Sequence, residues 1–296
     1  MGRFYGAAKM LYQVIRPLKE KIIVQLADIY YKNSTDKEIR KAMHYAKKNG
    51  RMKTFNDPFT EKYENCIYDI RKDKQSGMYY VDYHGHVMYF SKDYFSVKSC
   101  QNYLRGIFME QDKKSPHKYL SEEFCVDDGS IVIDAGAAEG NFSLDIVGRC
   151  SKIILVECNK NWIEALKRTF AAEIAEGKVE IVAKILSDKN TKKEISIDAL
   201  FARYGRIDFI KMDIEGGEER ALKGAAGWME QSRSPVKMAV CTYHTPEAFH
   251  KIRTILKGRF QVSCSKGYLY FNEIWNFQPP YLRRGVIRAT KIIKPD

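Results

Sequence analysis

Apolar and polar residues alternate regularly from about residue 130 onward. Short runs rich in β-branched residues predict strands, and stretches with apolar residues at helical spacing predict helices. The predicted strands are SIVIDAG, KIILVEC, KVEIVAKIL, IDFIKMDIEG and VKMAVCTYH, and the predicted helices cover 141–149, 160–175, 217–231 and 246–257. Repeated strand–helix–strand units favour parallel strands joined by right-handed crossovers. The pattern therefore predicts a doubly wound, mostly parallel α/β sheet.

The chain beyond residue 258 predicts a different end to this sheet. RFQVSCS and GYLYFNE have the composition of consecutive strands, which favours a closing antiparallel hairpin, and GVIRATK is a candidate for a later strand. Tyr281, Arg283 and Arg284 lie in the same region and are candidates for the substrate cap, where an arginine pair suits a phosphate or carboxylate. The alternative for such a pair is a solvated tail.

The beginning of the chain predicts two helices. Apolar residues recur at helical steps from Phe4 to Ile29 and leave a basic polar side. Such a helix packs on its own domain, or lies on a partner chain or a membrane surface as a peripheral contact. A second helix is expected within 33–50, with Ser34 or Thr35 as its N-cap and Gly50 at its end.

A Tyr-rich region follows these helices. The runs GMYYVDY and HVMYF predict a β-hairpin with its turn at His84, Gly85 and His86. The two histidines are also possible metal ligands, but no cysteine or acidic residue lies at the spacing of a metal site. Residues 99–125 are expected to be mostly helical. We therefore expect an N-terminal extension over 1–125, serving as substrate cap or partner contact, and a main domain over 126–296.

The excess of basic residues lies at the two ends of the chain. Residues 1–125 have 23 basic and 15 acidic residues, 126–276 have 22 and 21, and 277–296 have 5 and 1, so the segments carry +8, +1 and +4 of the net +13. The neutral centre argues against nucleic acid as a partner of the main domain. Basic flanks suit an anionic acceptor, carrier or membrane surface, or are simply solvated.

Cysteine usage and the N-terminus bear on the compartment. Seven cysteines, an odd number without a C-x-x-C pair, predict reduced thiols without structural zinc or disulfides. Charged residues interrupt the N-terminal stretch, which argues against a signal peptide. We also find no run near the roughly 18 apolar residues of a membrane span. A cytoplasmic protein is the expectation, and homo-oligomerisation stays open.

The turn after the first strand of the main domain predicts a cofactor site. Ligands of doubly wound sheets bind beyond the carboxyl ends of the strands. The sequence VIDAGAAEGNFS has Gly136 and Gly140 but lacks the third glycine of a dinucleotide fingerprint, and Asp134 and Glu139 would repel a pyrophosphate. Two acids instead suit a cationic ligand rich in hydroxyl and amino donors. S-adenosylmethionine has this chemistry, and Ala137 and Asn141 of the same turn would also contact it.

Acids at the ends of the next two strands fit the same cofactor. Glu157 follows the second strand, where it can accept hydrogen bonds from both ribose hydroxyls, as in nicotinamide cofactors too. Asp188 follows the third and can accept from the adenine amino group. For each of these acids the alternative is a helix cap or turn residue.

Four stretches of the main domain resemble a known family. VIDAGAAEGNFSL, ILVECNKNWIEAL, AKILSDKN and above all IDFIKMDIEGGEERALKGA are similar to successive motifs of the FkbM family of S-adenosylmethionine-dependent methyltransferases, over roughly 130–245. Met212, Ile214 and Gly217 depart conservatively from the family's usual IKIDVEGAE. The resemblance implies a class I methyltransferase fold with a Rossmann-like sheet, and O-methylation of a hydroxyl on a sugar, a glycan or a natural product.

Methyl transfer to a neutral hydroxyl requires alignment of the acceptor and removal of its proton. Strand alternation places Lys211, Asp213 and Glu215 on one side of the fourth strand. Asp213 is the first candidate for the catalytic pocket, with Glu215 and Lys211 beside it. His244, after the fifth strand, is the candidate base or substrate ligand, since its ordinary pKa of about 6.5 suits proton transfer.

Structural roles compete with these catalytic ones. Glu215 and Glu218 would favour the dipole of the following helix, Lys211 would pair with an acid, and His244 would belong to a strand-to-helix turn. Asp213 and His244 are also two ligands for a divalent metal, but two do not establish a site, so we predict no metal. Two alternatives to a small-molecule or glycan O-methyltransferase stay open: a nucleic-acid methyltransferase and a non-catalytic cofactor-binding protein. Against the nucleic-acid methyltransferase, the sequence lacks an Asn/Asp-Pro-Pro-Tyr/Phe motif for an extruded base.

Overall fold

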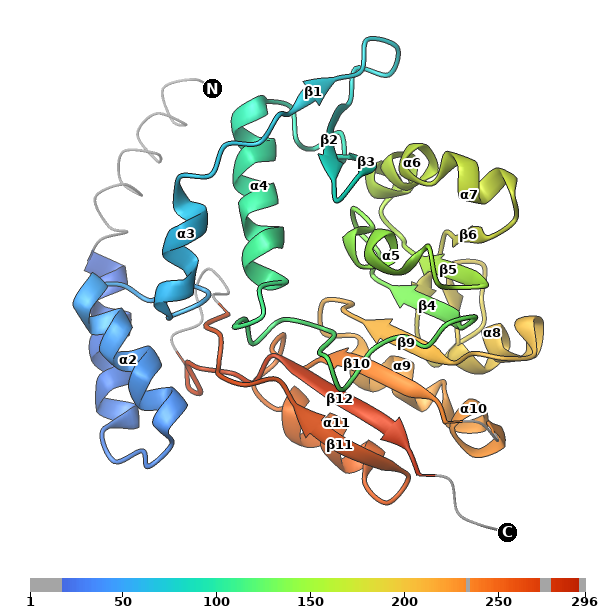
Figure 1. The fold of residues 1–296 in the computed structure, drawn as a ribbon. Helices are drawn as coiled ribbons and strands as arrows, with labels where there is room; N and C mark the ends of the chain where they lie inside the picture. The colour runs from blue at the N-terminus through green and yellow to red at the C-terminus, as the bar shows by residue number, and fades with distance from the viewer. Residues whose placement is uncertain (1–17, 233–234, 272–277, 293–296) are drawn as a thin grey trace.

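A seven-stranded sheet forms the centre of the protein, as the computed structural model shows for residues 18–232, 235–271 and 278–292 (Figure 1). Its strand order is β11-β12-β10-β9-β4-β5-β6. The strands are β4 (Ile131–Ala135), β5 (Lys152–Val156), β6 (Val179–Val182), β9 (Phe209–Met212), β10 (Lys237–Cys241), β11 (Phe260–Cys264) and β12 (Val286–Lys291). All neighbouring pairs are parallel except the two that β12 makes with β10 and β11. The predicted doubly wound, mostly parallel sheet is confirmed.

Helices cover both faces of this sheet because successive strand residues point to opposite sides. In β4, Val132 packs into one core and Ile133 into the other. The helices on the Ile133 side are α8 (Ile197–Tyr204), α9 (Glu218–Lys223), α10 (Ala226–Gln231) and α11 (Ala248–Leu256). Those on the Val132 side are α4 (Val97–Glu110), α5 (Asn141–Ile146), α6 (Lys160–Thr169) and α7 (Ala171–Ala175). Both faces of the sheet are thus buried.

The N-terminal segments extend the Val132 core and add a third cluster. They comprise a helix over 18–31, α2 (Lys37–Asn49), η1 (Pro58–Thr60), α3 (Glu61–Glu64), β1 (Arg71–Lys72), β2 (Tyr79–Tyr83) and β3 (His86–Tyr89). The hairpin of β2 and β3 is confirmed, and its turn residues His84 and Gly85 have positive φ. The first two helices pack against Tyr270, Tyr281 and Leu282 from the other end of the chain. Within the described residues, no helix has the length and apolarity to cross a membrane.

The structure corrects several predicted elements. Residues 267–271 form only isolated bridges, from Leu269 to Phe55 and to Arg283, and the antiparallel partner of β11 is β12, the strand GVIRATK. Asp36, rather than Ser34 or Thr35, caps α2, while Gly50 ends it as predicted. Helix α4 ends at Glu110, and 111–125 is not helical.

Two further elements depart from the sequence pattern. The run KVEIVAKIL divides into β6 and a separate strand β7 (Ile185–Leu186), which pairs with β8 (Glu194–Ile195). Helix α8 was not predicted at all. Residues 4–17 of the first predicted helix lie outside the described residues.

Candidate functional site

The turn between β4 and α5 has a backbone that requires glycine. Gly136 and Gly140 have φ of 70° and 83°. A Cβ at Gly136 would lie 1.8 Å from the carbonyl oxygen of Asp213, and one at Gly140 would lie 2.6 Å from the ring of Phe170. These two glycines therefore let the turn pack closely against the end of β9 and against Leu166 and Phe170.

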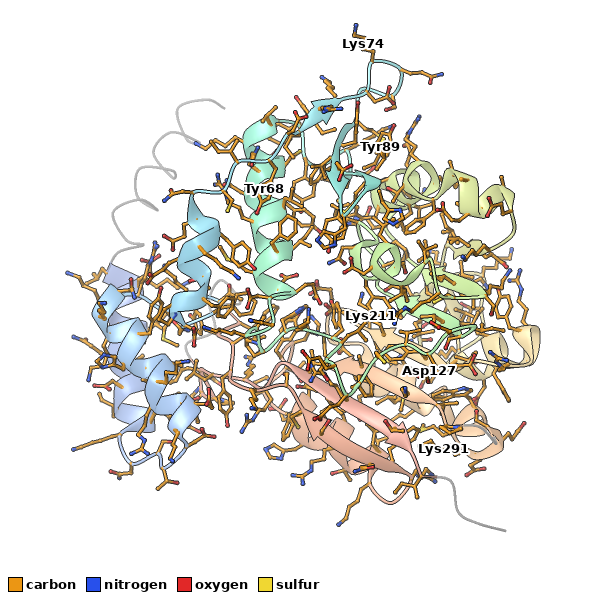
Figure 2. All side chains as sticks on the ribbon, in the orientation of Figure 1. Tyr68, Lys74, Tyr89, Asp127, Lys211 and Lys291 are labelled. Atoms are coloured by element: carbon orange, nitrogen blue, oxygen red, sulfur yellow. The ribbon has the colours of Figure 1, made fainter. Side chains whose placement is uncertain are left out.

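Beneath this turn lies a buried ion pair. Nζ of Lys211, near the middle of the molecule in Figure 2, is 3.0 Å from Oδ1 of Asp134, and both side chains are almost fully buried. The same ammonium donates to the carbonyl of Gly136 at 2.7 Å, and Ser143 donates to Asp134. Burial alone would lower the pKa of Lys211, but the charges of Asp134 and Asp213 raise it above its usual range. Lys211 is therefore charged and holds the turn in place.

Two further acids border the turn. Glu157, directly after β5, accepts hydrogen bonds from the backbone N–H of Ala138 at 3.0 Å and of Asn159 at 2.7 Å. Glu139 accepts one from the Tyr103 hydroxyl, and burial raises the pKa of Glu139 to about 7. The structure thus brings the predicted acids of the first two strand ends to the same turn.

The other predicted cofactor residues, Ala137, Asn141 and Asp188, do not all lie at the turn. Ala137 is buried in the turn, and Asn141 is the first residue of α5, where its side chain accepts from the N–H of Phe142 at 2.7 Å. Asp188 follows β7 and pairs with Arg220 of α9 at 3.1 Å. Asp188 is therefore engaged in an ion pair of its own rather than gathered with Glu157.

Asp213, directly after β9, is surrounded by hydrogen-bond donors. The hydroxyl of Tyr119 donates to its Oδ2 at 2.8 Å, and that of Tyr243 to its Oδ1 at 3.1 Å. Nε2 of His117 lies 3.3 Å from Oδ2, and Nε2 of His244 lies 3.3 Å from Oδ1. Burial would raise the pKa of Asp213, but the hydrogen bond and charge of His117 and the charges of Lys211 and His244 lower it below its usual range.

His244, after β10, has carboxylates near both of its ring nitrogens. Nδ1 lies 2.9 Å from Glu218, whose same oxygen accepts from the backbone N–H of Ile214 at 3.0 Å. Nε2 lies 3.6 Å from Glu215, an exposed residue with a positive φ of 54°. Burial would lower the pKa of His244, but the hydrogen bond to Glu218 and the nearby carboxylates raise it. The imidazole can exchange a proton with a group near Asp213.

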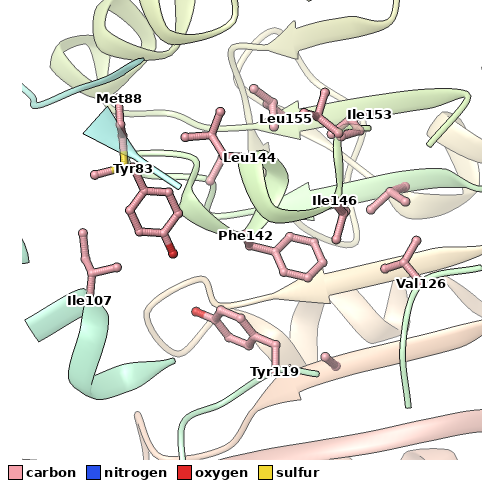
Figure 3. Packing of buried hydrophobic residues seen from close by; sticks show 14 of the residues in the cluster. Tyr83, Met88, Ile107, Tyr119, Val126, Phe142, Leu144, Ile146, Ile153 and Leu155 are labelled. Atoms are coloured by element: carbon pink, nitrogen blue, oxygen red, sulfur yellow. The ribbon is translucent and has the colours of Figure 1, made fainter. Parts of the chain in front are cut away.

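Sequence reasoning missed two residues of this cluster. His117 and Tyr119 come from the segment after α4, which was predicted to be helical and was assigned to the extension. Tyr119 packs edge-on against Phe142 of α5, with ring centroids 5.7 Å apart (Figure 3). The only sequence signal for them is a pair of polar aromatic residues in the segment that precedes the first strand of the main domain.

The C-terminal arginines are also part of the folded structure. Arg283 is buried and donates to the carbonyls of Tyr243 and His244 at 2.7 and 2.9 Å. Arg284 lies 3.3 Å from Asp36. Arg283 therefore fixes the loop that carries His244, and the solvated tail considered from the sequence is wrong for this pair.

Two groups among the described residues have the ligand types of a metal site. They are His117, Asp213 and Cys241, and Asp213, Glu218 and His244, with ligand atoms within 4.8 Å of one another in each. Direct pairing of histidine with carboxylate accounts for the short distances in both groups. All seven cysteines are free thiols, as predicted. We assign no metal to these groups.

The central sheet has the strand order of the class I methyltransferase fold that the sequence predicted. β12 runs antiparallel between β10 and β11, and acids lie at the ends of β4, β5 and β9. Residues 184–270 match the model of the Methyltransferase FkbM domain. This match includes Asp213, Glu215 and His244, and it confirms the resemblance seen in the sequence. Residues 184–270 are thus similar to the Methyltransferase FkbM domain.

Comparison with solved structures gives similarities at low identity. The methyltransferase FkbM from Methylobacillus flagellatus KT is 18% identical, with a TM-score of 0.43 over 68% of this chain and 56% of that protein. SMU.1697c, a putative methyltransferase from Streptococcus mutans solved in complex with SAH, is 12% identical, with a TM-score of 0.38 over 64% and 97%. The chain thus spans little more than half of the Methylobacillus protein. No curated protein matches the sequence.

Proposed function

We propose that this methyltransferase uses S-adenosylmethionine to methylate a hydroxyl group of a sugar, glycan or natural product. One observation carries the proposal: Gly136 of the turn lies directly against the carbonyl of Asp213. The turn has the acids that suit a cationic nucleoside, and Asp213 belongs to the cluster with His244. A methyl donor on the turn would therefore lie beside the groups that activate an acceptor.

The cofactor site consists of residues around the turn and the neighbouring strand ends. Glu157 accepts hydrogen bonds from the ribose hydroxyls, and Glu139 attracts the ammonium or sulfonium charge. The backbone of the turn takes the methionine carboxylate, since its N–H groups precede α5. Within this set, Asp134 acts indirectly, through its ion pair with Lys211, and Asp188 is included because it follows the end of β7. The full proposed set is Asp134, Gly136, Ala137, Glu139, Gly140, Asn141, Glu157 and Asp188.

When bound, S-adenosylmethionine would supply an activated methyl group to the acceptor oxygen, and its carbon–sulfur bond would break with the electron pair remaining on sulfur. The proton of the hydroxyl passes to Nε2 of His244. Glu218 keeps Nδ1 protonated and so directs the free lone pair of Nε2 toward Asp213. Asp213, Glu215 and Lys211 orient and charge the pocket, since a carboxylate with a lowered pKa and a charged lysine are poor bases.

The extension and the chain ends are the proposed acceptor side of the site. The acceptor is a small molecule or glycan rather than nucleic acid, because the main domain is nearly neutral. Contact of the basic N-terminal helix with an anionic membrane surface is a secondary proposal.

Two experiments test the proposal. Incubation with labelled S-adenosylmethionine and a fractionated extract of glycans and metabolites should label a product in which a hydroxyl has become a methyl ether. Label found only on nitrogen, on carbon or on nucleic acid would overturn the assignment of the acceptor. This assay needs only the full chain.

Titration calorimetry tests the cofactor site. Glu157→Gln should weaken S-adenosylmethionine binding by about tenfold or more, since a ribose acceptor is lost. Glu164→Gln is the matched control, because Glu164 is an exposed acid of α6 that pairs with Lys92. Equal affinities for the two variants and the original chain would place the cofactor elsewhere.

A further inference from the structure

The segment 111–120, which links α4 to the main domain, is fixed to the sheet by backbone contacts. Arg288 of β12 donates to the carbonyls of Lys118 and Tyr119 at 2.8 and 2.9 Å, and Ser265 donates to the carbonyl of Pro116. Gly285 lies so close that a Cβ there would be 1.8 Å from the carbonyl oxygen of Pro116. The segment is non-helical and yet held in one position.

Neighbouring residues of this segment face different surroundings. Pro116, Lys118 and Leu120 line a cavity of about 1030 Å³ on the outer side. His117 and Tyr119, between them in sequence, point inward and are 3% and 5% exposed. The inward pair therefore meets the end of β9 rather than solvent.

Both inward residues contact the same carboxylate oxygen. The Tyr119 hydroxyl donates to Oδ2 of Asp213 at 2.8 Å, and Nε2 of His117 lies 3.3 Å from that oxygen. Nε2 of His117 is also 3.0 Å from the hydroxyl of Tyr243, which donates to Oδ1. This leaves Oδ1 as the oxygen that faces His244.

We infer that His117 and Tyr119 are positioning residues of the transfer reaction, supplied to the active site by the extension. They hold Oδ2, which keeps Oδ1 of Asp213 turned toward His244 and the acceptor. The methyltransferase site is incomplete without residues 111–120, although these lie outside the matched FkbM segment 184–270. This inference rests on the proposed function for its catalytic meaning.

Packing alone does not account for this arrangement. An apolar side chain at position 117 would fill the same space without a buried ring that needs a partner. The imidazole instead lies between a carboxylate and a phenol, and its Nδ1 has no hydrogen-bond partner within the part of the chain that the structure describes. Partners that orient a catalytic ligand typically change activity by about 10–100-fold when they are replaced.

Steady-state kinetics of His117→Gln test the inference. We expect kcat to fall by about 10–100-fold, with the dissociation constant of S-adenosylmethionine within about twofold of the original. Tyr119→Phe, which removes one hydroxyl and keeps the ring, should show the same pattern more weakly. Lys114→Gln is the control, because Lys114 is an exposed residue of the same segment that lines the outer cavity. An unchanged kcat, or a kcat loss matched by equal losses of cofactor affinity and thermal stability, would overturn the inference.

Histidine NMR provides a test that does not need an acceptor. The pKa of His117 is raised: burial would lower it, but the charge of Glu110 and the pairing with Asp213 more than offset burial. The ionisable groups facing the ring are Glu110, Lys211, Asp213, Cys241 and Tyr243. We expect one ring resonance, absent in His117→Gln, to titrate above pH 6.5 and to shift downward in Asp213→Asn.

The two tests separate this inference from the proposed function. If the His117 resonance shifts in Asp213→Asn but the protein methylates no hydroxyl, the contact between His117 and Asp213 is supported and only the proposed reaction is wrong. A His117 resonance indifferent to Asp213→Asn would overturn the inference, whatever the acceptor is.

Discussion

Glu218 and His244 form an ion pair of 2.9 Å in which the two side chains are only 2% and 3% exposed. A buried histidine next to a carboxylate retains its proton to higher pH than a free one. This pairing determines the pH at which Nε2 can accept a proton from an acceptor.

The pH dependence of methyl transfer should reflect this pair. The pKa of His244 is raised above 6.5, so the neutral base forms only as the pH rises through that higher value. We expect kcat to increase as the pH rises above 6.5. Glu218→Gln removes the carboxylate and should move the rising limb to lower pH, measured as kcat between about pH 6 and 10. If the rising part of the kcat–pH profile does not move in Glu218→Gln, His244 is not the base in the rate-limiting proton transfer.

Conformational stability should change with pH in the opposite sense. A histidine whose pKa is raised on folding stabilises the protein fully below its unfolded pKa of about 6.5, and the contribution is lost as the pH rises through the folded value. His117 and His244 are both raised. The free energy of unfolding, from urea titrations, should therefore fall from pH 6 to pH 9, and the slope should be smaller in His117→Gln.

Removal of one partner from the buried pair beneath the turn should be costly. Lys211→Met leaves the Asp134 carboxylate buried without its cation, and we expect a loss of about 3–5 kcal/mol in unfolding free energy. Lys237→Met is the control, because Lys237 pairs with the largely exposed Asp127 at 2.8 Å. That change should cost under about 1 kcal/mol. Similar losses in both variants would mean that Asp134 and Lys211 are not coupled as described.

The close approach of Gly136 to β9 predicts a steric effect. Gly136→Ala would put a methyl group 1.8 Å from the carbonyl oxygen of Asp213, so the turn and the strand end must separate. S-adenosylmethionine binding and thermal stability should both decrease strongly. Gly148→Ala, where nothing lies within 4 Å of the added Cβ, should leave both nearly unchanged. Calorimetry and a melting curve of each variant make the comparison.

Glu139 should make cofactor binding depend on pH. Its pKa is raised to about 7 by burial, so the carboxylate is lost as the pH falls below that value. The affinity for S-adenosylmethionine, a cation at sulfur, should increase several-fold from pH 6 to pH 8. Glu139→Gln should flatten this dependence. S-adenosylhomocysteine, without the sulfonium, should show a weaker effect in the same titrations.

The sequence predicted the sheet and the cofactor turn because local patterns encode them. Apolar runs set the parallel strands, and each acid of the turn stands within a few residues of a strand end. Asp134, Glu157 and Asp213 could therefore be found from spacing alone. The ion-pair partners of these acids could not be found in this way. The sequence left Lys211 as a catalytic candidate or the partner of some acid, and the three-dimensional contact identifies that acid as Asp134.

The rest of the cluster depends on contacts distant in sequence. Tyr119 reaches Asp213 across 94 positions, and His117 reaches Tyr243 across 126. The sequence predicts that 99–125 is mostly helical, but 111–125 is not helical, and contacts with the sheet such as those of Arg288 hold it in place. The same dependence explains the misplaced final strand: GYLYFNE has β-forming residues, but the edge next to β10 is occupied by β12.

The position of β12 also sets an order for folding during synthesis. β12 lies between β10 and β11, yet it follows both in the chain. A ribosome delivers residues from the N-terminus onward, so β10 and β11 emerge before the strand that joins them. Arg283, just before β12, and Arg288, within it, hold the His244 loop and the segment 111–120, so these anchors also emerge after β10 and β11. A nascent chain that has completed the cofactor turn consequently has an open gap in its sheet and unanchored catalytic groups until residue 291 has left the exit tunnel.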